Sequence, residues 1–202
     1  MKIGVIIGSH RSKSQSGKVA GFVKAMLTQG ASAASVFTLD LAEKKLPLWD
    51  EGVWSGDPAW KKIWDPIAGE LKACDGFVVI SPEYHGMVPS ALKNFFLLAG
   101  KDELGHKPGL IVSVSSGRGG SYPVTELRTS SYKNSRLNWI PEHMIVRNSE
   151  QVLNGPQPVG EDDQFARERL QYCLKLLIEY SKALKLVRAS GVVDFKTHPN
   201  GM

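Results

Sequence analysis

The chain has 202 residues, of which 42% are hydrophobic and 22% charged, a size and composition that fit one globular domain. Its net charge of +5 suits a phosphate-bearing ligand, but Lys and Arg are scattered along the sequence, so we expect no nucleic-acid partner. The two cysteines, Cys74 and Cys173, stand far apart with no C-x-x-C or Cys/His cluster, which indicates neither a disulfide framework nor a metal site.

The sequence also carries no signal for a membrane or for export. No basic segment followed by an apolar stretch opens the chain. No apolar run approaches the roughly 18 residues that a membrane-spanning helix needs. We therefore expect a cytoplasmic protein, with no membrane partner and with both thiols buried.

The hydrophobic pattern predicts strands that alternate with helices. In chain order, we expect a strand at Lys2–Ile7, a helix at Gln15–Leu27, a strand at Ala34–Leu39, a helix at Trp60–Lys72, a strand at Phe77–Ser81, a helix at Pro89–Leu98, a strand at Gly109–Val114, a helix at Tyr122–Ser135, a strand at Met144–Arg147 and a helix at Glu161–Val187. The central run Phe77–Ser81 is apolar without alternation, as in a parallel strand covered on both faces. This pattern predicts an α/β fold, a doubly wound five-stranded parallel sheet with helices on both faces. We expect it to form a single domain over residues 1–190, followed by a loose tail at residues 191–202.

Ligands of a doubly wound sheet bind outside the carboxyl ends of the strands, where the strand order reverses. The loops after the first, third and fourth strands are therefore the candidate site. The first loop, GSHRSKSQS at residues 8–16, combines serine hydroxyls, the planar cation of Arg11 and the start of a helix. Free N–H groups and the positive end of the helix dipole add to these donors, so the loop favours a terminal phosphate.

Two nucleotide motifs resemble parts of the chain only superficially. The stretch SKSQSGKV is close to a Walker A loop, but Ser12 replaces its first glycine and Val19 its magnesium-binding hydroxyl. The stretch GRGGSY has Tyr122 in place of the last glycine of a dinucleotide fingerprint and follows the fourth strand. A serine-rich helix cap remains an alternative for the first loop, although it accounts for one hydroxyl only.

The loop after the third strand reads SPEYHGMVPSALKNF, residues 81–95. Together with GSHRSKS it resembles the NADPH-dependent FMN reductase family, which includes related quinone and azo reductases. The resemblance extends over residues 1–184, and P-E-Y-x-G followed by P-x-x-L-K-N is its most specific part. It implies a flavodoxin-like fold with strand order 2-1-3-4-5, FMN as cofactor and NADPH or NADH as electron donor.

The resemblance also implies which residues bind the cofactor. Residues that match the family's phosphate loop are Ser9, Arg11, Ser14, Gln15 and Ser16; those that match the segment along the flavin ring are Pro82, Glu83, Tyr84, His85 and Gly86; those that match the loop near the pyrimidine side are Ser115, Gly117, Arg118 and Gly119. The family usually has Asn where this chain has His85, whose imidazole either contacts the flavin or a substrate or has no special role. Lys93 and Asn94 match a pair that we expect to brace the loop from the following helix.

The implied activity is hydride transfer from NAD(P)H through FMN to a small-molecule acceptor: a quinone, free flavin or azo compound. Because positioning supplies the rate of such a reaction, we expect no catalytic side chain. Arg118 either steers the phosphates of NADPH or is a solvated loop residue. The alternative function is a non-enzymatic flavodoxin-like electron carrier or partner-binding protein, which the basic net charge disfavours.

Residues 46–66 carry four of the five tryptophans of the chain. Trp60 and Trp64 are four positions apart, which predicts core packing on one helix face. Trp49 and Trp54 stand in a stretch rich in Gly, Asp and Pro, as expected of a loop that forms a subunit interface or a substrate lid. The family resemblance implies a homodimer or homotetramer, and our hypothesis is that this loop reaches the neighbouring flavin site. A structure with both loop tryptophans buried in their own subunit would reject it.

Overall fold

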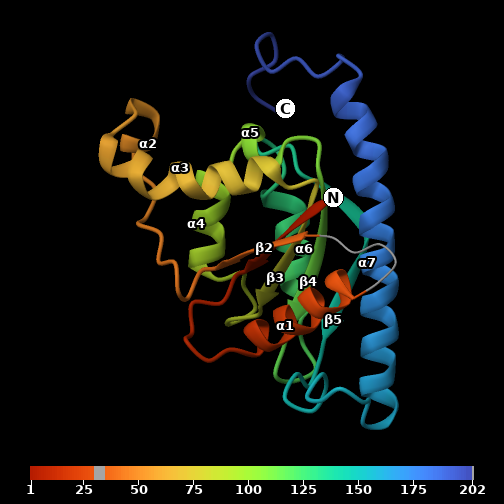
Figure 1. Cartoon of the computed structure of the whole chain (residues 1–202). Helices are drawn as coiled ribbons and strands as arrows, with labels where there is room; N and C mark the ends of the chain where they lie inside the picture. The colour runs from red at the N-terminus through yellow and green to blue at the C-terminus, as the bar shows by residue number, and fades with distance from the viewer. Residues whose placement is uncertain (30–34, 202) are drawn as a thin grey trace.

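The computed structural model describes residues 1–29 and 35–201, and its centre is a five-stranded parallel sheet (Figure 1). The strands are β1 (Lys2–Ile7), β2 (Ser35–Asp40), β3 (Gly76–Pro82), β4 (Pro108–Val114) and β5 (Asn138–Val146). The helices are α1 (Gln15–Thr28), α2 (Gly52–Ser55), α3 (Pro58–Ala73), α4 (Ser90–Leu98), α5 (Lys101–Leu104), α6 (Ser121–Ser130) and α7 (Gly160–Ala189). The strand order is β2-β1-β3-β4-β5, so the predicted doubly wound, flavodoxin-like fold is confirmed.

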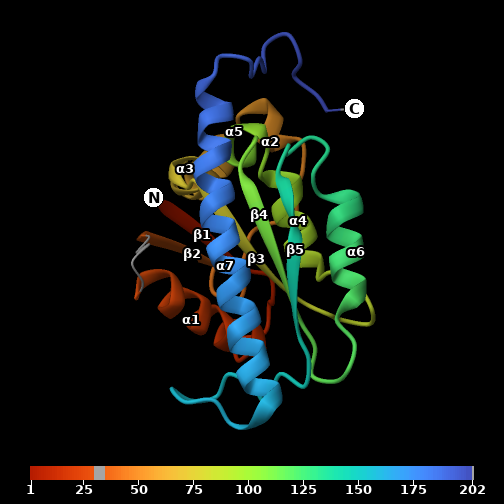
Figure 2. The same cartoon turned by 90° about the vertical axis from the view of Figure 1, so that its right-hand side faces the viewer.

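Helices cover both faces of the sheet. On one face α1 and α7 bury side chains such as Val19 and Leu170 against β1, β3, β4 and β5. On the other face α3, α4 and α6 bury a second cluster that includes Leu71, Leu92 and Leu127. Every residue of β3 and β4 is buried, which explains their continuous apolar sequences. Figure 2 shows α7 running along the outside of the sheet with α1 beside it.

Most expected elements are present, and the corrections have physical causes. The fifth strand is Asn138–Val146 and not Met144–Arg147, because its exposed edge residues interrupt the apolar pattern that marks the buried strands. The helix expected at Tyr122–Ser135 ends at Ser130, where Trp139 Nε1 donates to Leu127 O at 3.1 Å and Ser131 Oγ at 3.0 Å. The short helices α2 and α5 were not predicted, since four residues carry no helical period. Ala34, the expected start of the second strand, lies outside the described residues.

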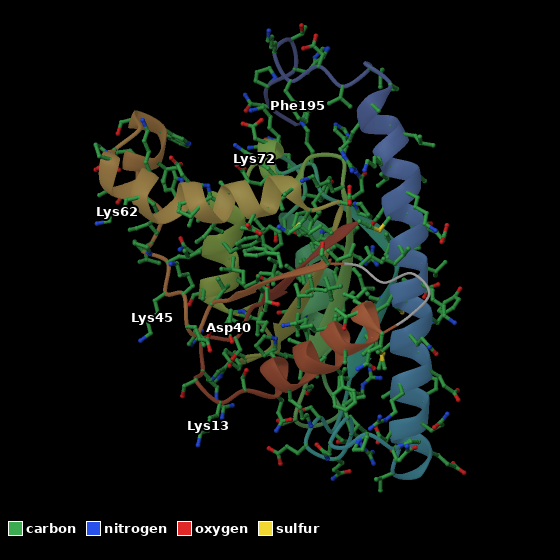
Figure 3. All side chains as sticks on the ribbon, viewed as in Figure 1. Lys13, Asp40, Lys45, Lys62, Lys72 and Phe195 are labelled. Carbon is green, nitrogen blue, oxygen red and sulfur yellow. The ribbon has the colours of Figure 1, made fainter. Side chains whose placement is uncertain are left out.

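The segment after α7 is not a loose tail. Phe195 stacks on His106 with ring centroids 5.7 Å apart, and Arg136 Nη2 donates to the carbonyls of His198 and Asn200. These contacts lie where β4 and β5 begin, at the amino ends of the strands. The tail therefore packs at the end of the sheet opposite to the candidate loops. Figure 3 shows Phe195 and Lys13 at opposite ends of the molecule.

Burial of the cysteines and of two tryptophans is as predicted. Cys74 and Cys173 are buried free thiols, and burial raises the pKa of the Cys74 thiol to about 11. Trp60 and Trp64 belong to the core between α3 and the sheet. Among the residues that the structure describes, none of the helices has the length and apolar character to cross a bilayer.

Candidate functional site

The strand order reverses between β1 and β3, and the loops that follow these two neighbouring strands form the centre of the candidate site. Gly8 N donates to Ile80 O at 2.8 Å, so the first loop leaves the sheet directly beside β3. A Cβ at Gly8 would lie 2.6 Å from a methyl of Leu92 and 2.9 Å from Ile80 O. The close approach of the two backbones thus requires glycine at this position.

The hydroxyls of the first loop have different roles. Ser14 caps α1, because its Oγ accepts from Gly17 N at 3.0 Å, so the capping alternative explains this one serine. Ser9 is buried, and its Oγ accepts from Arg11 N at 3.2 Å and forms a 2.9 Å hydrogen bond with Tyr84 OH. Ser9 therefore joins the first loop to the second.

Two other groups of the first loop, in contrast, are buried without a partner. Ser16 Oγ and Gln15 Oε1 make no hydrogen bond with any described residue, and the first turn of α1 has no acidic side chain. An unpartnered buried hydroxyl costs about 1–3 kcal/mol, so such groups are expected where a ligand completes the site. The Arg11 side chain is exposed at the same loop. Donors and positive charge thus gather at the start of α1, as an anion requires.

Lys18, the lysine of the Walker-like stretch, points away from this loop. Its Nζ donates to Ser149 O at 2.5 Å, to Val152 O at 2.8 Å and to Asn154 Oδ1 at 2.7 Å. Burial lowers the pKa of its ammonium group. Lys18 therefore fixes the segment after β5 and does not serve as the phosphate-binding lysine of a triphosphate loop, in agreement with the exclusion of a Walker A loop.

The second loop is a two-residue hairpin turn. Tyr84 N donates to Met87 O at 3.0 Å and Met87 N to Tyr84 O at 2.9 Å, and both central residues have positive φ, 52° at His85 and 72° at Gly86. Positive φ at both centres defines a type I′ turn, which favours Asn-Gly because Asn tolerates the left-handed region. Histidine is also enriched there, so His85 satisfies the same backbone requirement as the Asn usual in the family. Its side chain is exposed.

Glu83 connects the second loop to the third. Its backbone N donates to Val114 O at 3.0 Å, and its carboxylate accepts from Gly120 N. Gly120 has a φ of 103°, and a Cβ there would lie 2.4 Å from Ile145 Cγ2. On the other side of the third loop, Arg147 Nε donates to the carbonyls of Arg118 and Gly119 at 2.8 and 3.1 Å. The loop is held by ionic groups on both sides, while Gly117, Arg118 and Gly119 remain exposed.

The Lys-Asn pair on α4 braces two different loops. Lys93 Nζ lies 2.6 Å from Glu126 Oε1, and Glu126 Oε2 accepts from Val88 N at 2.8 Å, so Lys93 supports the second loop as expected. Asn94 supports another segment: its Nδ2 donates to Pro47 O at 2.7 Å and its Oδ1 accepts from Trp49 N at 2.8 Å. The sequence did not reveal this second contact, because Asn94 and Trp49 are far apart along the chain.

The structure thus brings all three predicted loops to one end of the sheet. The sequence reasoning missed Arg147, Lys18 and Glu126 as supporting residues, and it expected Asn94 to brace the second loop and not the segment at residues 47–49. A strand end is a recognisable position for Arg147, whereas the partners of the other three follow only from the packing of α1, α4 and α6.

Comparison with known proteins decides the family. Residues 1–151 match the model of the family described as NADPH-dependent FMN reductase. The chain belongs to the NADPH-dependent FMN reductase family.

Proteins with similar sequences come from several organisms. An NADPH azoreductase of Bacillus sp. (strain OY1-2) is 29% identical over 189 residues, which cover 93% of this chain and 97% of that protein. An NAD(P)H-dependent FMN reductase of Saccharomyces cerevisiae is 30% identical over 143 residues, covering 60% of this chain and 68% of the relative. A quinone reductase of Pseudomonas putida is 29% identical over 126 residues, or 59% and 63% of the two chains.

Solved structures agree on the fold. The flavoenzyme NAD(P)H:(acceptor) oxidoreductase of Paracoccus denitrificans superposes with a TM-score of 0.67 at 19% identity, covering 90% of this chain and 97% of the other. An oxidoreductase of Corynebacterium diphtheriae gives a TM-score of 0.66 at 17% identity with the same coverage.

The residues present fit the family's cofactor, FMN. Besides Ser16, the hydroxyls of Ser113 and Ser149 near the third loop are buried without a partner in the described residues. The first loop offers donors for a phosphate, and the glycines of the third loop leave backbone exposed for a ring. The first turn of α1 has no acidic side chain that would repel a monophosphate, and the carboxylate of Glu83 in the second loop accepts a hydrogen bond from Gly120 N.

Proposed function

We propose that this protein passes hydride from NADH or NADPH through FMN to a quinone, free flavin or azo-type acceptor, and that it acts in the cytoplasm. The supporting observation is the meeting of three loops at the carboxyl end of the sheet, around its switch point, with a buried Ser16 hydroxyl at the start of α1 that has no partner among the described residues. Family membership and the names of the relatives agree with this reaction class.

We assign the phosphate of FMN to the first loop. Ser9, Arg11, Ser14, Gln15 and Ser16 form this part of the site. Ser14 acts through the helix cap, and Ser9 by fixing the loop against Tyr84. Ser16 donates to the phosphate with a hydroxyl that has no other partner among the described residues, and Arg11 contributes an exposed cation.

The flavin ring is assigned to the second and third loops. The ring segment consists of Pro82, Glu83, Tyr84, His85 and Gly86, and the pyrimidine-side segment of Ser115, Gly117, Arg118 and Gly119. The type I′ turn and the Glu83–Gly120 contact hold these backbones in fixed directions before the cofactor binds. Arg118 is free to meet the phosphates of the nicotinamide nucleotide.

When bound, FMN supplies the hydride chemistry, accepting two electrons and a proton equivalent from the nicotinamide and delivering them to the acceptor. The chain's contribution is to bind and orient the reactants, so we name no catalytic side chain. The hydrogen-bonded loops hold the reactants in position. The third loop is exposed, so the nicotinamide nucleotide or the acceptor can reach the flavin ring there.

The segment at residues 46–66 is proposed to contact a second subunit. Trp54 lies on α2 and is 78% exposed, while Trp49 is half-buried and packs edge to face against it with centroids 4.7 Å apart. The two tryptophans are not both buried in their own subunit, so the hypothesis of a dimer contact stands. Asn94 connects this segment to the helix that follows the second loop.

The test is an FMN titration of apoprotein, followed by NADPH oxidation with a quinone. We expect Ser16→Ala to weaken FMN binding about 5- to 30-fold, corresponding to about 1–2 kcal/mol for one hydrogen bond to a charged group, without loss of apoprotein stability. Ser12→Ala, at an exposed serine of the same loop, is the matched control. Equal FMN affinities of the two variants would contradict the phosphate site. An FMN-loaded protein without turnover would favour the electron carrier instead.

A further inference from the structure

The outer flank of α7 carries a largely apolar stripe, interrupted by Arg169, that no described element covers. Its large members are exposed to 65% at Phe165, 48% at Tyr172, 37% at Tyr180 and 40% at Val187. Between them lie Arg169, the half-buried Leu176 and the exposed Ala183. Successive members of this stripe are three or four residues apart, so they fall on one helix face. Figure 2 shows α7 along the outside of the molecule with no other element in front of it.

The stripe is separate from the face that holds α7 on the sheet. That inner face consists of Asp163, Ala166, Leu170, Cys173, Leu174, Leu177, Ile178 and Ser181. The stripe lies on the flank toward the edge strand β5, where Arg169 forms an ion pair with Glu142. The opposite flank carries polar residues such as Gln164, Gln171, Lys175 and Lys182. On this flank Leu176 packs against the core and Arg169 pairs with Glu142, while the large side chains of Phe165, Tyr172 and Tyr180 remain exposed.

The spacing of the stripe is symmetric about its centre. Counted from Leu176, its members stand 4, 7 and 11 positions away in both directions. An antiparallel copy of the same helix would therefore place Phe165 against Val187 and Tyr172 against Tyr180, and Leu176 would meet its own equivalent. Such self-complementarity is what a two-fold symmetric interface requires.

The charges of α7 favour the same antiparallel arrangement. Residues 160–174 contain the acidic Glu161, Asp162, Asp163 and Glu168 and the basic Arg167 and Arg169; residues 175–189 contain the acidic Glu179 and the basic Lys175, Lys182, Lys185 and Arg188. A two-fold axis at Leu176 brings the net negative half of one helix beside the net positive half of the other. Lys175 and Lys182 lie on the polar flank, and Lys185 and Arg188 lie near Asp75 of their own subunit, so this attraction acts between whole helices and not within the stripe. A parallel arrangement would align like-charged halves.

From this symmetry and charge we infer that two copies of the chain associate through α7, antiparallel, about a two-fold axis at Leu176. A 30-residue helix is about 45 Å long, so a stripe about 11 Å wide buries roughly 500 Å² on each copy. The total of about 1,000 Å² is at the lower limit for a specific interface, so we expect association that depends on concentration. This contact lies across the molecule from α2 (Figure 1), and its Phe165 end borders the cavity that Arg118 and Asn148 line beside the third loop.

The first experiment measures mass by light scattering over a concentration series. We expect Tyr172→Glu to halve the mass of the assembled protein, because it places a charge in the stripe. Gln171→Glu is the matched control: it adds the same side chain one residue away, on the polar flank, and should keep the mass of the unmodified protein. A protein that stays monomeric up to about 100 µM, well above the micromolar affinities of many specific interfaces, or a Tyr172→Glu variant of unchanged mass, overturns the inference.

The second experiment tests the position of the axis by oxidative cross-linking. Leu176→Cys should form a disulfide between copies, because residues on a two-fold axis meet their equivalents. Phe165→Cys alone should not, because its equivalents would be about 33 Å apart, far beyond disulfide reach. Mixed with Val187→Cys, it should form a heterodimer. Failure of Leu176→Cys to cross-link, or self-linking of Phe165→Cys, would exclude this geometry even if the protein is oligomeric.

Discussion

Replacement of Gly120 by alanine should destabilise the protein and displace the third loop. Gly120 has a φ of 103°, a conformation that costs an L-residue about 1–2 kcal/mol. The new Cβ would lie 2.4 Å from Ile145 Cγ2, and relief of such overpacking costs about 1–3 kcal/mol. We therefore expect a loss of about 2–5 kcal/mol in the free energy of unfolding.

Gly117 in the same loop provides the matched control. A Cβ there meets no atom within 4 Å, and its φ is not positive. Gly117→Ala should leave the free energy of unfolding unchanged or raise it by up to about 1 kcal/mol, since alanine restricts the unfolded chain. The two variants thus change the same residue type, three positions apart, with opposite expected effects.

Urea unfolding of the two apoproteins, followed by tryptophan fluorescence and circular dichroism, measures this difference. With an m-value of about 2 kcal/mol/M, the midpoint of Gly120→Ala should fall by about 1–2.5 M relative to Gly117→Ala. Its FMN affinity should fall as well, because Gly120 N holds the Glu83 carboxylate. A midpoint within about 0.25 M of the control would refute the reasoning from backbone conformation and overlap.

Three further predictions concern residues outside the phosphate loop. Burial lowers the pKa of Lys107 to about 8 from 10.5. The contribution of this group to stability is therefore complete above pH 10.5 and is lost as the pH falls toward 8, so the free energy of unfolding should rise by roughly 3 kcal/mol between pH 8 and 10.5. Lys107→Met should remove that rise from the pH profile of unfolding. Asn94→Leu should lower the free energy of unfolding by about 2–4 kcal/mol, because Pro47 O and Trp49 N lose their partners. The tryptophan emission should shift to the red, and an unchanged emission would contradict the contact. His85→Asn should change the free energy of unfolding by no more than about 0.5 kcal/mol, whereas His85→Val should lower it by about 1–2 kcal/mol by straining the type I′ turn. Equal melting temperatures of these two variants would argue against that turn.

The sheet could be predicted from the sequence because its central strands are buried on both faces. Strands such as Phe77–Ser81 and Gly109–Val114 are continuous apolar runs, and no competing pattern exists for them. The edge strand β5 was predicted too short, since one side of it faces solvent and its apolar residues are interrupted by Pro141 and Glu142. Local periodicity is informative where burial is uniform and fails at edges.

The candidate loops could be located from the sequence, but their supports could not. Strand ends and glycine-rich composition identify the loops, and the resemblance assigns them to FMN. The Ser9–Tyr84 and Glu83–Gly120 contacts, in contrast, depend on how separate strand ends converge in space. Ser14 and Ser16 also look alike in sequence, and only the helix geometry shows that Ser14 caps α1 while Ser16 has no hydrogen-bond partner among the described residues.

The folded C-terminal tail has a consequence for how the protein can be handled. Phe195 and the carbonyls of His198 and Asn200 are held near the amino ends of β4 and β5, so the last residues point away from the cofactor loops. A surface or electrode coupled through a flexible extension after residue 202 would therefore leave the loops facing solution. Removal of residues 191–202 would uncover the His106 ring and the Arg136 guanidinium, so immobilisation should extend this terminus and not shorten it.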